Sequence, residues 1–128
     1  MLYMPIIGDH IKVNLQDIYS MEEKLNRKRI DFYKLLEVAL LLKDVETTVH
    51  CESLSQREIL KFELIDGHHR CRALLELNVQ EAFIEYNGAT FYRANENFIL
   101  LKDVPVLNEQ EYEEWHRKTY GSLQSGLA

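Results

Sequence analysis

The sequence predicts a single mixed α+β domain, in which a small mixed sheet is packed with helices and followed by a C-terminal helix. Its 128 residues match the usual size of one domain. Apolar residues alternate with polar ones in several short segments, as in half-buried strands, and recur at helical spacing in others. No repeat or linker separates these segments. We therefore expect one domain over residues 1–120 and a flexible tail over residues 121–128.

Two strands and one helix are expected in the first part of the chain. Apolar alternation over residues 10–15 predicts the first strand. Asp31 is a good N-cap for a helix over residues 32–44, and the broad apolar face of that segment predicts a largely buried helix. The β-branched run at residues 47–51 predicts a short second strand.

A glycine turn is expected between a strand and a helix in the middle of the chain. In a strand over residues 59–65, the alternation places Glu63 on the outer face. The strand ends at Asp66–Gly67, and helical spacing continues from His68 to Leu77.

A hairpin and a helix are expected in the last third. Asn87–Gly88 tolerates the positive φ angles of a type I′ turn, which predicts a β-hairpin over residues 81–93. A final helix is predicted over residues 108–120, with Asn108 and Glu111 as its capping box.

Composition excludes several classes of protein. With 46% hydrophobic and 28% charged residues, five glycines and two prolines, the chain is neither collagen-like nor of low complexity. Its 15 Lys and Arg residues against 21 Asp and Glu residues leave a net charge of −6. Proteins that bind DNA without sequence preference present a basic field instead. We expect no tight non-specific DNA binding.

Cysteine content and hydropathy indicate a cytoplasmic protein. Cys51 and Cys71 are too few for a disulfide framework or a four-ligand zinc site, and no charged-then-apolar leader opens the sequence. The most apolar window, residues 35–42, is far shorter than the roughly 18 to 20 residues that cross a bilayer. We expect no contact with a membrane.

The turn from Asp66 to Arg70 has the chemistry of an anion-binding site. Gly67 permits a sharp turn, the first N–H groups of the following helix lack intrahelical partners, and the helix dipole favours negative charge. Arg70 adds a bidentate fork for phosphate oxygens, and His69 adds a donor that strengthens on protonation. The alternative is structural, with Asp66 capping the helix and the other side chains solvating its first turn.

Asp66 and His68 are the candidate catalytic residues of this turn. A histidine beside a carboxylate suits a general base or a metal ligand, but the ligand set is not closed. We expect no dedicated metal site, because Mg²⁺ more often arrives with the phosphates of its ligand.

The same segment, Leu64–Ala73 (LIDGHHRCRA), resembles the signature of the ParB/sulfiredoxin superfamily. Partition proteins of that family carry a Gly-Glu-Arg-Arg-x-Arg-Ala box, and sulfiredoxins carry Gly-Cys-His-Arg. Upstream, Asn26–Asp31 (NRKRID) is similar to the Arg-containing box before the family's first helix. The resemblance covers about residues 10–86 and implies a ParB/sulfiredoxin-like domain.

In that family the Gly-x-x-Arg turn grips nucleotide phosphates. The resemblance therefore implies phosphate contacts from Gly67, His69 and Arg70, a second contact from Arg27, and a match of Arg72 to the last arginine of the box. It implies a nucleotide as ligand, with ATP, ADP and CTP not distinguished, and Mg²⁺ as its companion. It also implies phosphoryl transfer or nucleotide hydrolysis as an extension of binding.

Two departures from the family pattern limit the chemistry expected. Sulfiredoxins place a reactive cysteine directly after the glycine, where this chain has His68 and carries Cys71 three residues later. Sulfinic-acid reduction is therefore not expected. The nearest match to the Glu-Asn-x-x-Arg motif of partition proteins begins at Glu96–Asn97 and lacks the arginine.

Other features leave further roles open. Glu22 and Glu23 precede the Arg27 box, and the resemblance to a free-serine kinase of this fold implies a carboxylate base from this loop. The alternative is structural, with the two carboxylates forming a solvated face. A protein partner or a homodimer is a further expectation, and so is a DNA-associated accessory, a nuclease or a non-enzymatic interaction module. Local contact with DNA would come from the basic patch of Lys24, Arg27, Lys28, Arg29 and Lys34.

Overall fold

The computed structural model describes residues 5–54, 61–89 and 98–127, with side chains as far as Gly121. Its elements in chain order are β1 (His10–Asn14), β2 (Tyr19–Ser20), β3 (Leu25–Asn26), α1 (Arg27–Lys34), α2 (Val38–Thr48), β4 (His50–Ser53), β5 (Phe62–Leu64), α3 (His68–Glu76), β6 (Glu81–Ala89), β7 (Ile99–Leu100), a 3₁₀ turn η1 (Leu101–Asp103), β8 (Val106–Leu107) and α4 (Glu109–Leu127). The mixed α+β class is confirmed.

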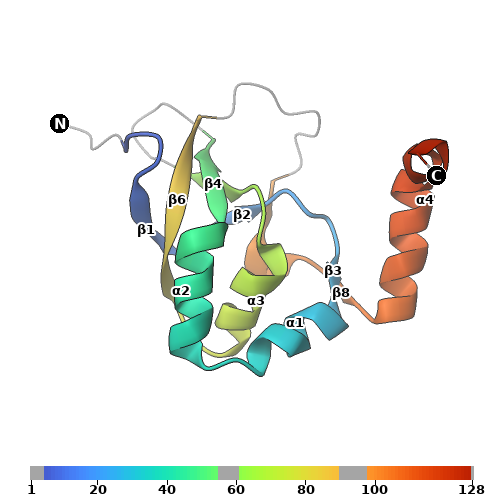
Figure 1. The fold of residues 1–128 in the computed structure, drawn as a ribbon, viewed down its shortest axis with the longest axis horizontal. Coiled ribbons are helices and arrows are strands. Elements are labelled where there is room, and N and C mark those ends of the chain that lie inside the picture. Colours follow the sequence, from blue (N-terminus) through green and yellow to red (C-terminus); the bar gives the residue numbers. More distant parts are fainter. Residues whose placement is uncertain (1–4, 55–60, 90–97, 128) are drawn as a thin grey trace.

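The strands form a larger mixed sheet and a small second one. The six-stranded sheet has the order β1-β6-β4-β5-β2-β7, and the two-stranded sheet pairs β3 with β8 in parallel. β6 runs antiparallel to β1 and parallel to β4. In Figure 1, α2 lies against β6, with α3 beside it, while α4 stands to one side beyond β3 and β8.

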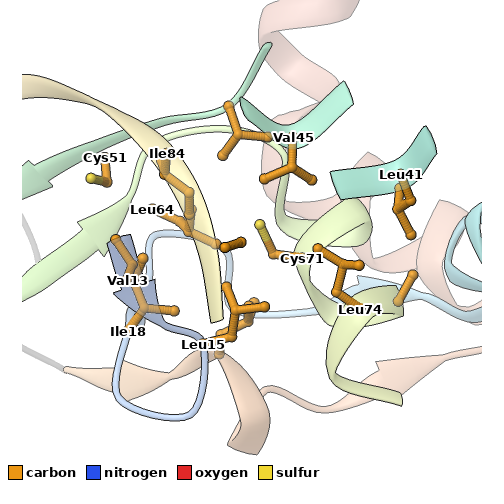
Figure 2. Close-up of a cluster of buried hydrophobic side chains, with 14 of the residues drawn as sticks. Val13, Leu15, Ile18, Leu41, Val45, Cys51, Leu64, Cys71, Leu74 and Ile84 are labelled. Atoms are coloured by element: carbon orange, nitrogen blue, oxygen red, sulfur yellow. The ribbon is translucent and has the colours of Figure 1, made fainter. Parts of the chain in front are cut away.

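The core lies between the larger sheet and the two helices α2 and α3. Figure 2 shows side chains of the sheet facing those of the helices. The sheet side includes Leu64 and Ile84, and the helix side includes Leu41, Val45 and Leu74, all of which are fully buried. Burial of this apolar surface, at about 25 cal/mol per Å², holds α3 and its preceding turn against the sheet.

Both cysteines belong to this core. Cys51 on β4 and Cys71 on α3 are free thiols with no exposed surface. Burial raises the pKa of Cys51 to about 12 and raises that of Cys71 well above the ordinary range. Neither thiol is positioned or ionised for nucleophilic chemistry.

The predicted helix over residues 32–44 is wrong, because two shorter helices occupy this region. Asn26, not Asp31, caps the first helix, and its side-chain oxygen accepts a hydrogen bond of 2.9 Å from the N–H of Lys28. The chain then turns after Lys34, and α2 begins at Val38.

The expectation of a buried helix here is also wrong. Phe32 is 60% exposed and Leu35, in the turn between the two helices, is 84% exposed. Only Ile30 on α1 and Leu41 and Val45 on α2 are buried in these helices. The apolar residues that a single helix would have placed on one face are thus divided between two helices, each of which buries only part of them.

The predicted hairpin at Asn87–Gly88 is also wrong. β6 continues through both residues to Ala89, because its pairing with β4 extends to Ser53 opposite Ala89, whereas its pairing with β1 ends at Glu85. Gly88 has φ +99° within this strand. Residues 90–93, the rest of the predicted hairpin, lie outside the described residues.

Strand boundaries and faces differ in two further places. The predicted strand at residues 47–51 is shifted, since Thr47 and Thr48 complete α2 and β4 spans His50–Ser53. Glu63, expected on the outer face of its strand, is 2% exposed. Side chains on both faces of β5 are buried or partly buried, so the alternation of apolar and polar residues does not distinguish an inner from an outer face in this strand.

The final helix begins as predicted. The N–H of Glu111 donates to the Asn108 Oδ1 atom at 2.8 Å, and the N–H of Asn108 donates to the Glu111 Oε1 atom at 3.2 Å, which is the reciprocal pairing of a capping box. Glu114 and Lys118 form an ion pair of 3.1 Å. The helix extends to Leu127, past the predicted end at Tyr120. None of the helices within the described residues has the length and apolarity that crossing a membrane requires.

Candidate functional site

The turn before α3 presents unpartnered backbone donors. Gly67 occupies the N-cap position in the left-handed region, with φ 72° and ψ 24°, and no described side chain caps the helix. The first intrahelical bond is that from the Cys71 N–H to the Gly67 carbonyl, at 3.0 Å. The N–H groups of His68, His69 and Arg70 therefore precede the helical hydrogen-bond pattern, as expected for an anion-binding helix start.

Gly67 is required by both conformation and space. A Cβ atom at this position would overlap the side chain of Val49, which precedes β4. The positive φ angle independently disfavours other residues. The glycine thus lets the end of β5 and the start of α3 approach β4 closely.

Asp66 does not cap α3. Its Oδ1 atom accepts a hydrogen bond of 2.6 Å from the His50 N–H, and its Oδ2 atom lies 3.1 Å from the His50 Nδ1 atom. The Nε2 atom of the same imidazole lies 2.7 Å from Glu85. The hydrogen bond and charge of Asp66, together with Glu85, raise the pKa of His50. His50, to which the sequence assigned no role, therefore anchors the turn.

A pocket of about 820 Å³ opens at the start of α3. Three segments enclose it: the end of β3 with α1, the Gly67 turn with α3, and the first turns of α4. It is lined by Asn26, Lys28, Arg29, Phe32, Tyr33, Gly67, His69, Arg70, Glu109, Tyr112, Glu113, His116 and Arg117. Of the predicted phosphate contacts, the structure brings Gly67, His69 and Arg70 to this pocket.

Arg70 is held in place from two sides. Its Nε group donates to the Asp44 Oδ2 atom at 2.6 Å, and its guanidinium carbon lies 4.9 Å from the centre of the Tyr33 ring. The side chain is 31% exposed. A guanidinium fixed through Nε retains its two terminal amino groups for an oxyanion.

His69 is neutral at pH 7. Its Nε2 atom accepts a hydrogen bond of 3.0 Å from the Asn26 N–H, and its ring contacts Tyr112 edge to face. Burial, together with the charges of Arg29, His68 and Arg70, lowers the pKa of His69 to about 4. The ring therefore links α3 to β3 and does not supply the positive charge expected from protonation.

Arg27 and Arg72 lie outside the pocket lining. Arg27 donates to Glu76 at 2.7 Å and to Asp31 at 3.2 Å. Arg72 donates from one amino group to the carbonyls of Leu101 and Val104, at 2.8 and 3.0 Å. These two arginines join α3 to α1 and to the η1 turn.

Arg29, rather than Arg27, faces the pocket. Its guanidinium carbon lies 5.6 Å from the Tyr112 ring centre, and the side chain lines the pocket. Arg29, Phe32 and Tyr33 share one face of α1 at the spacing i, i+3 and i+4. Once α1 is known to begin at Arg27, this spacing lets the sequence predict that the three side chains lie on one face. Arg117 and Tyr112 of α4 could not be found in this way, because nothing local places α4 over the pocket.

His68, a candidate catalytic residue, is part of the core. It is 4% exposed, its Nε2 atom accepts a hydrogen bond of 3.2 Å from the Met21 N–H, and its ring also hydrogen-bonds the backbone of Leu64. Burial lowers its pKa to about 4. The ring joins the loop after β2 to the end of β5. Among the described residues, no cluster of three or more His, Cys, Asp and Glu side chains is arranged to hold a metal ion.

Glu22 does not line the pocket, but the charges of two lining residues, His116 and Arg29, act on its carboxyl group. It is half-buried in the loop between β2 and β3, and burial raises its pKa against the opposing effect of His116 and Arg29. Glu23, the other carboxylate predicted for this loop, is exposed. Glu22 is therefore the carboxylate of this pair that the structure couples to the pocket.

Comparisons with known proteins leave the family open. No family model matches the chain, and no curated protein matches it. Among solved structures, the chain is similar to protein Atu1540 from Agrobacterium tumefaciens, with 9% identity and a TM-score of 0.47. The similarity covers 88% of this chain and 48% of that one, so this chain spans about half the length of that protein. A likeness this distant carries no functional assignment.

Proposed function

We propose that this protein binds a nucleotide or a related phosphorylated ligand in the pocket between α1, α3 and α4. The observation that carries the proposal is the convergence of Arg70, Arg29 and the uncapped start of α3 on one pocket. Backbone N–H groups at a helix start and a fixed guanidinium are a recurrent pair of phosphate ligands. The ParB/sulfiredoxin resemblance of the same turn agrees with this ligand class.

The local charge of the pocket supports an anionic ligand. Four cationic side chains line it, against two carboxylates, although the whole chain carries a net charge of −6. Lys28 is paired with Glu109 at 3.0 Å, and Arg70 is paired through Nε with Asp44 at 2.6 Å. Arg29, Arg117 and the two terminal amino groups of Arg70 are then left toward the ligand. A cationic pocket in an acidic protein concentrates small anions while the remaining surface repels a long polyanion.

The test is a ligand panel measured by thermal shift and calorimetry. ATP, ADP, CTP and inorganic phosphate are compared at 150 mM salt, with and without Mg²⁺. We expect a nucleotide to bind, and Arg70→Ala to weaken it about ten- to one-hundred-fold, as for loss of a charge-assisted contact. Arg27→Ala is the matched control, because Arg27 lies on α1 with Arg29 but pairs with Glu76 outside the pocket. No binding by the wild type, or equal affinities in both variants, would contradict the proposal.

Phosphoryl transfer or hydrolysis is a second candidate function, favoured by the position of Glu22. Burial raises the pKa of Glu22, against the opposing charges of His116 and Arg29. A half-buried carboxyl group of this kind suits a general base that accepts a proton from an attacking hydroxyl or water. Glu22→Gln is then expected to retain nucleotide binding and to lose phosphate release. Turnover that is unchanged in this variant would exclude Glu22 as the base.

The DNA-associated alternative predicts a different result in the same assays. A duplex or single-stranded oligonucleotide would bind with nanomolar affinity at 150 mM salt, while free nucleotides would not. Five basic residues contact few phosphates, so we expect any duplex binding to fall by roughly ten- to one-hundred-fold between 50 and 200 mM salt.

A further inference from the structure

We infer that Phe32 is a stacking surface for the base of the ligand, so that the pocket takes a phosphorylated compound with an aromatic base and not a phosphorylated sugar or an inorganic polyphosphate. The inference rests on the proposed function and deepens it. Phe32 lies on α1, lines the pocket, and is 60% exposed. A large aromatic side chain left in water at the edge of a cationic pocket offers a ring face to a ligand.

The other rings that line the pocket are already occupied. The Arg70 guanidinium covers Tyr33, at 4.9 Å from the ring centre. Tyr112 is 6% exposed and contacts both Arg29 and His69. His116 packs against Tyr112 and Tyr120, with ring centres 6.0 and 4.9 Å away. Phe32 makes one edge-to-face contact, with Tyr33 at 5.4 Å, and is the most exposed of these rings among the lining residues.

The placement of Phe32 matches the layout of a nucleotide. Phe32 lies one helical turn after Arg29 on the same face of α1, and the Arg70 guanidinium rests on the neighbouring Tyr33. Phosphate groups held by the two arginines would therefore leave a base within reach of Phe32. The pocket volume of about 820 Å³ is within the range of roughly 300 to 1,000 Å³ typical of small-ligand sites.

Phe32 gives affinity without choosing among bases by hydrogen bonding. A phenylalanine ring has no donor or acceptor, and every base has a π face, so stacking is tolerant of base identity. We expect purine nucleotides to bind more tightly than pyrimidine nucleotides, because their rings are larger. Removal of a stacking side chain costs about five- to one-hundred-fold in affinity.

Calorimetry with ATP and with tripolyphosphate, each in the presence of Mg²⁺, tests the inference. Phe32→Ala is expected to lower ATP affinity about five- to one-hundred-fold and to leave tripolyphosphate affinity within about twofold. Phe32→Trp should retain ATP binding. The matched control is Phe83→Ala on β6, which removes another exposed phenylalanine, 46% exposed, from a position outside the pocket.

The outcomes separate this inference from the proposed function. If Phe32→Ala leaves ATP affinity unchanged, or lowers ATP and tripolyphosphate affinity by the same factor, the stacking role is overturned while the anion site stands. If the wild type binds neither compound, the proposed function fails and takes the inference with it. Circular dichroism of each variant verifies its fold. We expect both variants to fold, because Phe32 and Phe83 are largely exposed and contribute little to the core.

Discussion

The Nε group of Arg70 donates to the Asp44 Oδ2 atom across 2.6 Å, and this contact joins the first turn of α3 to α2. The two side chains are about one-third exposed, at 31% and 35%. Tyr33 of α1 supports the other side of the guanidinium. Arg70 is thus oriented toward the pocket by residues from two further helices, neither of which is adjacent to it in the sequence.

Asp44→Asn should weaken ligand binding through Arg70. The amide is uncharged and holds Nε less firmly, so we expect about a three- to ten-fold loss of nucleotide affinity, measured by calorimetry. In an Arg70→Ala background the same substitution should have no further effect. Additive losses in this double-mutant cycle would show that Asp44 acts independently of Arg70.

Arg72→Ala should reduce stability and spare binding. Arg72 donates hydrogen bonds to the backbone carbonyls of Leu101 and Val104, at 2.8 and 3.0 Å. The substitution would leave both carbonyls without this donor. We expect a loss of about 2 to 3 kcal/mol in the free energy of unfolding, measured by urea denaturation. Nucleotide affinity, measured where the variant is folded, should stay within about twofold of the wild type. A large loss of affinity would return Arg72 to the binding site.

Gly67→Ala should be more costly than an ordinary glycine substitution. The new Cβ would overlap the Val49 side chain, and alanine would also have to adopt the positive φ of Gly67. Overpacking and backbone strain together should lower the free energy of unfolding by about 2 to 5 kcal/mol. Gly8→Ala is the matched control, since Gly8 also has positive φ, +97°, but a Cβ there meets nothing within 4 Å. Denaturation should show the smaller loss for Gly8→Ala. Equal losses would mean that the approach of Val49 to the turn is unimportant.

Stability should decrease as the pH falls from about 6.5 toward 4, because His68 is buried in its neutral form. The pKa of His68 is lowered to about 4, so the unfolded chain binds a proton that the folded protein does not, and stability rises with pH across this window. The contribution is up to about 3 kcal/mol. Thermal unfolding between pH 4 and 8 measures it. His68→Gln should reduce the slope of the profile without abolishing it, because the pKa of His69 is also lowered to about 4.

The His50 pair should have the opposite pH dependence. Asp66 and Glu85 raise the pKa of His50, so its stabilising contribution is complete below about 6.5 and is lost as the pH rises through the raised value. Both partners are partly exposed, which limits the contribution to below about 1 kcal/mol. His50→Gln should therefore lower the melting temperature more at pH 6 than at pH 9. A larger effect at pH 9 would contradict this role.

Both cysteines should resist alkylation in the folded protein. Burial raises the pKa of each thiol, so little thiolate forms and reagents lack access. Mass spectrometry after treatment with N-ethylmaleimide at pH 7 should show no adduct on the native chain and two on the urea-denatured chain. Cys71→Ser should keep ligand binding. A native adduct at Cys71 would reveal an opening of the core.

Local features were predictable because neighbouring residues determine them. The capping box of Asn108 and Glu111 forms within one helical turn. The strand before Asp66, the turn at Gly67 and the helix after it follow from local spacing and from the conformational freedom of glycine. The uncapped start of α3 is likewise a property of a few consecutive residues, and so it was predictable from local sequence.

Tertiary packing decided the remaining features, because they depend on contacts between distant segments. Pairing with β4, which reaches Ala89, carries β6 through Asn87–Gly88, where local turn preference favoured a hairpin. Ion pairing with Glu76 directs Arg27 away from the pocket, while the phase of α1 turns Arg29 toward it. The placement of α4 brings Arg117 opposite α1, and no pattern within α4 specifies that placement. The uncapped glycine turn before α3 is thus set by local sequence, whereas the packing of helices around it sets which cations and aromatic rings share its pocket.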